Sequence, residues 1–448
     1  MSQRREQSIK PPGRSPIRRA MRLANANAGL WAVGNGLVST QLVVYLASDF
    51  GAGGLGIGLI LAAPRFAGVM RLGVPALIAR LRRRKTICIA AYMASAVALC
   101  DLPLVASDAR LRALPGMAIA VLVAAWSIYH LLEYIGTVAL WSWLGDLTPP
   151  RIRGRLLGNR ERWLLIGRIV GMTASAGLAL FWPVVWPNVA RWQALAFSAF
   201  SGAVMMLVAI VPLSAMPAAN RTPSATPRAP WRTLLQALID RRYRRLLAAS
   251  CWIGIVNGFT QTANEIYPIR VLNLPYGWRL ALLGLMRAGQ SAIAPWAGRW
   301  TDRLGNRPVM IVSQLIAATG SLFLLAARPD FVWPLLGAYV AWIAYAGLNV
   351  GLDNVKLKLA PADNNAPYLA VYHAISDLAG GLAIVAGGHL FDKLDSGGSG
   401  ALQLYAQVFF WGWIARTSAI VFLVRIVEPG AQRLGRMSNG AERLKDKN

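Results

Sequence analysis

Long apolar stretches separated by short polar or basic segments recur along the whole chain. A helix needs about 20 mostly apolar residues to cross the hydrocarbon core of a bilayer. Twelve stretches reach this length, at 27–48, 55–79, 86–107, 115–146, 162–186, 190–217, 243–272, 277–299, 307–328, 331–359, 366–391 and 402–428. The pattern therefore predicts an all-α integral membrane protein with about twelve transmembrane helices.

A polar stretch separates the first six predicted helices from the last six. Its Pro-Ser-Ala-Thr-Pro run is typical of a surface linker. The expected parts are a basic cytoplasmic tail at 1–23, an N-terminal six-helix bundle at 24–217, a central cytoplasmic linker at 218–242, a C-terminal six-helix bundle at 243–428 and a cytoplasmic tail at 429–448.

Basic residues gather in alternate loops between the predicted helices. If the N-terminus is cytoplasmic, the clusters at 80–85, 151–162, 221–245 and 299–307 all fall on the cytoplasmic side. The opposite side then receives few basic residues, namely Arg110, Arg112, Arg191, Arg270, Arg279, Arg328 and Lys393. Since Lys and Arg are enriched in cytoplasmic loops, both termini are expected in the cytoplasm. The pattern favours a multi-pass cell membrane protein, and a bacterial inner membrane in particular.

Composition supports the membrane interpretation and disfavours several functions. The chain is 56% hydrophobic and 15% charged, whereas soluble domains are about a quarter charged. Its net charge of +28 sits in short loops, so nucleic-acid binding is not expected. Cys88, Cys100 and Cys251 lie in apolar stretches without CxxC spacing, which predicts neither a disulfide nor a metal site. No nucleotide-binding or hydrolase motif occurs, so neither a cofactor nor an enzyme activity is expected.

Two loops of the first half match two loops of the second half. An offset of 223 residues aligns Arg80-Leu81 with Arg303-Leu304. An offset of 212 residues aligns Leu147-Thr148-Pro149 with Leu359-Ala360-Pro361. The similar offsets indicate a parallel duplication of a six-helix unit.

The run Gly298–Arg307 closely matches the G-x-x-x-D-R-x-G-R-R loop signature of the major facilitator superfamily. With the loop Pro150–Arg160, it is the feature by which this chain resembles that superfamily. The first-half copy, Gly73–Lys85, keeps the basic cluster but has Ala79 where the Asp belongs. The resemblance implies two pseudo-symmetric six-helix bundles that rock around a midplane cavity.

Residues of these loops are candidates for a gate. They are Gly298, Asp302, Arg303, Gly305, Arg307, Arg153, Gly154 and Arg155. Asp302 could accept charge-assisted hydrogen bonds from Arg303, from Arg307 or from a neighbouring helix end. Such contacts would close the cytoplasmic side in one state and break in the other. Alternatively, the arginines set topology and bind anionic lipid headgroups.

Polar residues inside the predicted helices are candidates for solute binding or coupling, because lipid penalises them. They are Asn35, Gln41, Arg65, His130, Glu133, Arg168, Asn257, Gln261, Glu265, Arg287, Gln290, His373 and Asp377. Spacing by four residues places Asn257, Gln261 and Glu265 on one helix face, where they are expected to line the cavity.

Two His–carboxylate pairs could act as proton relays. His130 and Glu133 are three residues apart on one helix face. The alternative is that Glu133 is a fixed packing charge paired with Arg168 or Arg65. His373 and Asp377 are four residues apart and could form a second relay. Alternatively, they could form pairs with Lys356 or Lys358. Arg168 and Arg416 are expected to carry countercharges or to reach the membrane surface.

The sequence thus predicts a secondary active or facilitative transporter of a small solute that works by alternating access. Proton coupling through Glu133 or Glu265 is an open option, and Arg65, Arg168 and Arg287 favour a polar or anionic solute. Alternatives are a non-transporting sensor or scaffold, favoured by Ala79, and a membrane-embedded lipid-handling enzyme. The expected partners are the solute and membrane lipids, and a monomer is expected.

Overall fold

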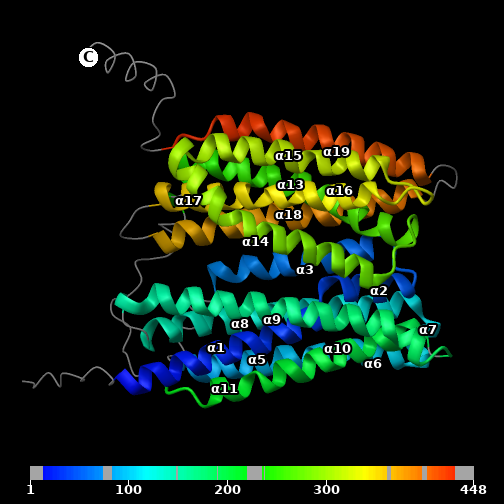
Figure 1. Ribbon diagram of the computed structural model, residues 1–448, viewed down its shortest axis with the longest axis horizontal. Helices are drawn as coiled ribbons and strands as arrows, with labels where there is room; N and C mark the ends of the chain where they lie inside the picture. The colour runs from blue at the N-terminus through cyan, green and yellow to red at the C-terminus, as the bar shows by residue number, and fades with distance from the viewer. Residues whose placement is uncertain are drawn as a thin grey trace, which may run out of the picture. The chain divides into compact units, whose positions relative to one another are not determined.

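The computed structural model describes residues 14–73, 83–147, 150–188, 190–218, 235–236, 238–360, 365–395 and 401–428. These residues form α-helices joined by short connections, with two short 3₁₀ helices (Figure 1). Most of the predicted linker 218–242 lies outside the described residues, as do Ala79, the first part of the N-terminal tail and the whole tail 429–448.

The helices follow the apolar stretches of the sequence closely. In the first part of the chain they are α1 (Arg14–Leu37), α2 (Thr40–Asp49), α3 (Gly54–Val69), η1 (Met70–Leu72), α5 (Arg84–Leu99), α6 (Asp101–Ser107), α7 (Ala109–Ala113), α8 (Pro115–Leu147), α9 (Pro150–Val185), α10 (Arg191–Val208) and α11 (Ile210–Ser214). Then come α13 (Arg241–Arg270), α14 (Tyr276–Leu304), α15 (Asn306–Ala326), α16 (Pro334–Ala341), η2 (Trp342–Ala344), α17 (Tyr345–Leu359), α18 (Asn365–Asp395) and α19 (Ala401–Val424).

Nine segments among the described residues are helical, long and apolar enough to cross a membrane, which confirms the predicted multi-pass membrane protein. Three of the twelve predicted stretches, 55–79, 243–272 and 277–299, are not among these nine segments. Their helices are α3, α13 and α14. Helix α3 is apolar but only 16 residues long. Helices α13 and α14 have 30 and 29 residues, so their polar side chains, not their length, set them apart.

Contacts along the chain divide it into two compact units. Unit 1 comprises Met1–Ser39, Gly73–Asp108 and Ile128–Ser224, and unit 2 comprises Thr40–Leu72, Ala109–Ser127 and Ala225–Asn448. The division into bundles at 24–217 and 243–428 stays a prediction.

Unit 1 is organised around α1, which packs against α9 and α10. The α1–α9 contact depends on glycines: a Cβ atom on Gly167 would overlap the carbonyl oxygen of Gly29, and one on Gly171 that of Val33. Small residues of this kind let helix backbones approach closely where lipid supplies no hydrophobic drive for association.

Unit 2 uses the same device between α13 and α18. A Cβ atom on Gly258 would overlap the carbonyl oxygen of Gly380, and one on Gly387 that of Phe259. Helix α18 also packs against α3, and α15 runs beside α19 (Figure 1). Helix α13, which carries the polar stripe predicted from the sequence, is thus packed closely against α18.

Candidate functional site

A cavity of about 530 Å³ lies within unit 2, a volume typical of small-molecule sites. Its walls come from α2, α3, α13, α14, the segment α16–η2–α17 and α19. Of the residues predicted from the sequence, those that line it are Gln41, Arg65, Asn257, Gln261, Glu265, Arg287 and Gln290. The polar residues of α13 and α14, which distinguish these two helices from the apolar spans, therefore lie in one site.

A buried ion pair lies in this cavity. The Nη2 atom of Arg279 on α14 lies 2.6 Å from Oε2 of Glu265 on α13, and the two side chains are 2% and 12% exposed. Arg279 also donates from Nε to Oε1 of Gln41, at 3.4 Å. Its guanidinium lies over the ring of Tyr339, 5.2 Å from the centroid. Together these contacts hold the charge of Arg279 in place without full hydration.

Arg416 on α19 is the second buried arginine of the cavity. Its Nη2 donates to Oγ1 of Thr260 at 2.8 Å, and its Nη1 donates to Oγ of Ser321 at 3.0 Å. No carboxylate among the described residues forms an ion pair with it. Neutral hydroxyls orient this guanidinium but leave its charge uncompensated.

Further polar contacts lie along the wall of the cavity. The hydroxyl of Tyr345 donates to Oδ1 of Asn257 at 3.0 Å. Arg287 donates from Nη1 to Oε1 of Gln290 at 3.2 Å, and Nε2 of Gln290 donates to the carbonyl oxygen of Trp342 at 3.0 Å. These bonds hold the amide and guanidinium groups in place along the wall.

Arg65 and the predicted pair on α18 share one neighbourhood. Arg65 lines the cavity and is attracted by the charge of Asp377, which lies against Gly68 one turn further along α3. His373 does not line the cavity, and its Nε2 atom lies 3.5 Å from Nζ of Lys356. His373 therefore lies beside Lys356, and Asp377 lies near Arg65.

Unit 1 contains a second, partly buried carboxylate, Glu133 on α8. Its Oε1 accepts a hydrogen bond from Nε1 of Trp31 at 3.1 Å, and its Oε2 lies 3.4 Å from Nδ1 of His130. Beside it, Nδ2 of Asn35 donates to the hydroxyl of Tyr129 at 2.9 Å. Asn35, His130 and Glu133 therefore gather near one another, as a proton relay would require.

Arg168 was the other partner considered for Glu133. It lies on α9 with an exposed side chain. Among the described residues no ion pair joins it to Glu133. The groups that contact Glu133 are an indole, an imidazole and the hydroxyl of Tyr129, and none of them carries a permanent positive charge.

The loop predicted as a gate lies between α14 and α15. Gly305, with φ of 89°, ends α14 in a backbone conformation that only glycine adopts without strain. Asp302, Arg303 and Arg307 are exposed, and among the described residues no hydrogen bond or ion pair holds Asp302. The predicted residues Arg153, Gly154 and Arg155 lie within α9.

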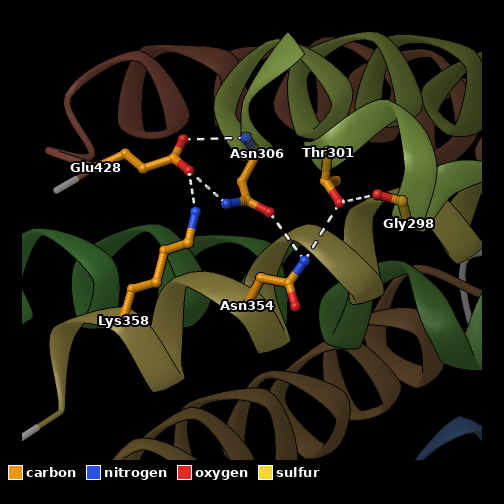
Figure 2. A network of polar contacts seen from close by, with 6 residues as sticks. All are labelled: Gly298, Thr301, Asn306, Asn354, Lys358 and Glu428. Atoms are coloured by element: carbon orange, nitrogen blue, oxygen red, sulfur yellow. Dashed lines mark hydrogen bonds and ion pairs between the residues drawn. The ribbon is translucent and has the colours of Figure 1, made fainter. Parts of the chain in front are cut away.

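Figure 2 shows the polar network at this loop, and its carboxylate is Glu428. Oε2 of Glu428 accepts from the backbone N–H of Asn306 at 3.0 Å, the first residue of α15. Oε1 accepts from Nδ2 of Asn306 at 2.5 Å and from Nζ of Lys358 at 2.8 Å. Glu428 thus caps α15 from a segment 122 residues away.

The network continues to α14 and α17. Asn354 donates from Nδ2 to Oδ1 of Asn306 at 3.1 Å and to Oγ1 of Thr301 at 3.3 Å, and Thr301 donates to the carbonyl oxygen of Gly298 at 2.7 Å (Figure 2). Burial alone would raise the pKa of Glu428, but hydrogen bonds from Lys358 and Asn306 and the charge of Lys358 lower it below its ordinary value.

Sequence reasoning missed the two buried arginines of the cavity. It counted Arg279 among the loop residues opposite the cytoplasm and treated Arg416 as a countercharge or surface-reaching residue. Arg279 could have been found, because it lies eight residues before Arg287, the spacing that also relates Asn257 to Glu265. The position of Arg416 depends on how α19 packs, which no local pattern records.

Comparisons with known proteins agree with this architecture. A family model described as Major Facilitator Superfamily matches residues 26–384. The tetracycline resistance protein, class E, of Escherichia coli is 30% identical over 152 residues, which are 34% of this chain and 33% of that protein. The alignment thus spans about a third of that relative's length.

Two solved structures share the fold. A mutant of the nucleoside transporter NupG has a TM-score of 0.68 and 14% identity, covering 91% of this chain and 100% of that chain. A D-xylose-proton symporter has a TM-score of 0.67 and 13% identity, covering 93% of this chain and 100% of that chain. At sequence identities this low, the structural similarity shows the fold alone. The two matches confirm the all-α fold class predicted from the sequence.

Proposed function

Because this chain belongs to the major facilitator superfamily, we propose that it is a secondary transporter that moves a small solute across a cell membrane by alternating access. The observation that carries the proposal is the polar cavity of unit 2, with the ion pair between Glu265 and Arg279 in its wall. Buried ionisable side chains on spanning helices are costly and persist where they serve a solute or ion pathway. This function requires no enzyme activity.

Proton coupling through Glu265 is the second part of the proposal. The guanidinium of Arg279 pairs with the carboxylate of Glu265 at 2.6 Å. In this proposal, solute binding at Arg279 and proton binding at Glu265 promote each other, as symport requires. Glu133, with His130 beside it, is the second candidate for the coupling carboxylate.

The positive-inside pattern supports an assignment of both termini to the cytoplasm. We further propose that the protein acts as a monomer in a bacterial inner membrane. Reaction of the termini with a membrane-impermeant probe in sealed, oriented vesicles tests this topology. Labelling of either terminus from the outside would refute it.

Transport is tested in proteoliposomes that contain the purified full-length protein. Thermal-shift screening against sugars, amino acids, organic acids, nucleosides and amphiphilic drugs first identifies a stabilising solute. Its accumulation under a proton gradient is then compared among wild type, Glu265→Gln, Glu133→Gln and the control Glu161→Gln, an exposed carboxylate on α9. We expect accumulation to disappear in Glu265→Gln, Glu133→Gln or both, while Glu161→Gln resembles wild type.

Two outcomes would count against the proposal. Absence of flux for every stabilising solute would refute transport and favour the sensor or scaffold alternative. Normal accumulation in both Glu265→Gln and Glu133→Gln would refute coupling through these carboxylates but leave transport intact. The sensor alternative rests on Ala79, which lies outside the described residues.

A further inference from the structure

The cavity of unit 2 carries an excess of positive charge. Four arginines line it, namely Arg65, Arg279, Arg287 and Arg416. Among its described lining residues the only carboxylate is Glu265, and Asp377 offsets part of the charge of Arg65 from α18. Guanidinium groups stay charged at any physiological pH. A cavity with this charge therefore favours an anionic occupant.

Two of these arginines present buried donors without a partner. Nη1 of Arg279 and Nε of Arg416 have no hydrogen-bond acceptor among the described residues. The two residues are 2% and 3% exposed. A buried donor left unpaired is destabilising, and native structures normally supply an acceptor. Here the acceptor is expected to come from whatever fills the cavity.

The other unpaired groups of the wall also favour an oxyanion. The hydroxyl of Tyr339, which can donate, is buried without a partner among the described residues, whereas Oδ1 of Asn264 is the unpaired acceptor there. Donors therefore predominate. Carboxylate and phosphate groups offer several acceptor oxygens and bind guanidinium groups through paired hydrogen bonds.

We infer that the cavity of unit 2 binds a small soluble anion that bears a carboxylate or phosphate group, with Arg279 and Arg416 donating to its oxygens. The further claim that this anion is the transported solute rests on the function proposed above. Glu265 already occupies Nη2 of Arg279, so it competes with the anion for the same guanidinium. Removing the charge of Glu265 should therefore strengthen anion binding, an effect that a purely structural ion pair would not produce.

The test is equilibrium binding to the purified full-length protein, measured by titration calorimetry in detergent. The anionic probes are succinate, citrate, inorganic phosphate and glucose 6-phosphate, and the matched neutral probes are succinamide and glucose. The variants are Arg416→Gln, Glu265→Gln, and Glu265→Gln combined with Arg279→Gln, which removes both charges of the ion pair. Arg425→Gln, an exposed arginine just after α19, is the matched control.

We expect at least one anion to bind wild type and its neutral counterpart to bind roughly 10-fold more weakly or not at all. Arg416→Gln and the double variant should weaken anion binding by roughly 10- to 100-fold. Glu265→Gln alone should tighten it, and Arg425→Gln should leave it unchanged. Unfolding temperatures of the variants show whether each one is folded.

Several outcomes would overturn the inference. They are failure of every anion to bind folded wild type, equal binding of the neutral counterparts, or wild-type affinity in Arg416→Gln and the double variant. In nanodiscs, an effect of phosphatidylglycerol without any effect of the soluble anions would assign the positive charge to a lipid headgroup instead. Binding needs no transport: anion binding without flux refutes the proposed function alone, whereas flux of a neutral solute without anion binding refutes this inference alone.

Discussion

Glu265 in unit 2 is buried and Glu133 in unit 1 is partly buried, and these two carboxylates have partners of different chemistry. Glu265 is paired with a guanidinium at 2.6 Å. Glu133 accepts from the indole N–H of Trp31 at 3.1 Å and lies 3.4 Å from the imidazole of His130. Each carboxylate is held by hydrogen bonds, but only Glu265 faces a permanent positive charge.

The difference lies in the group that must move before either carboxylate changes its partner. Arginine stays protonated, so the positive charge beside Glu265 is removed when a ligand or a conformational change moves Arg279. The groups that contact Glu133 carry no permanent charge, so no such charge has to be displaced in unit 1.

The largest effect is expected from breaking the ion pair of unit 2. Arg279→Gln leaves the charge of Glu265 buried and unpaired, which should lower the free energy of unfolding by about 3–5 kcal/mol. Adding Glu265→Gln removes the second charge and should restore most of the loss. Thermal unfolding in detergent measures both. Wild-type stability in Arg279→Gln would show that the pair is hydrated in solution.

Loss of the indole donor to Glu133 should have a smaller effect, because this donor is neutral. Trp31→Phe keeps an aromatic ring against Tyr92, whose centroid lies 4.3 Å away, but removes the N–H group. We expect the free energy of unfolding to fall by about 1.5–3 kcal/mol, since a hydrogen bond to a charged group is lost. A loss as large as that of Arg279→Gln would contradict the contrast between the two sites.

Glu428 extends the comparison to a carboxylate outside the spanning segments, and its geometry depends on Gly305. Gly305→Ala forces a side chain into a backbone conformation with φ of 89°, at a cost of roughly 2 kcal/mol. The added Cβ atom itself meets no overlap, so the strain comes from the backbone. Equal unfolding temperatures of Gly305→Ala and wild type would show that the loop relaxes freely.

The smallest effect is expected from Glu428 itself. Glu428→Gln keeps an acceptor at the start of α15 but removes the charge that pairs with Lys358, costing about 1 kcal/mol at neutral pH. The folded-state pKa of Glu428 is lowered. Its stabilisation is therefore fully present above the unfolded-state pKa of about 4.3 and is lost as pH falls through the folded-state value.

Thermal unfolding between about pH 6 and pH 3 measures this dependence. Wild type should lose more stability over this range than Glu428→Gln, which has no carboxylate to protonate at this position. Parallel curves for the two proteins would show that Glu428 does not contribute. The comparison isolates one carboxylate, because all others are present in both proteins.

The sequence by itself determined which residues form helices and which faces of them are polar. Apolar length predicted the spanning segments, and spacing by four residues placed Asn257, Gln261 and Glu265 on the face of α13 that lines the cavity. These properties are local, because they depend on the period of one helix and on the solvent around it.

Only the tertiary structure decided which distant groups meet. The carboxylate that caps α15 is Glu428, which lies 122 residues away along the chain, and no local pattern records this contact. Likewise, the partner of Glu265 is Arg279, which the charge pattern had counted as a loop residue. The energy of a buried charge depends on the groups that surround it in space, and helix packing sets those neighbours.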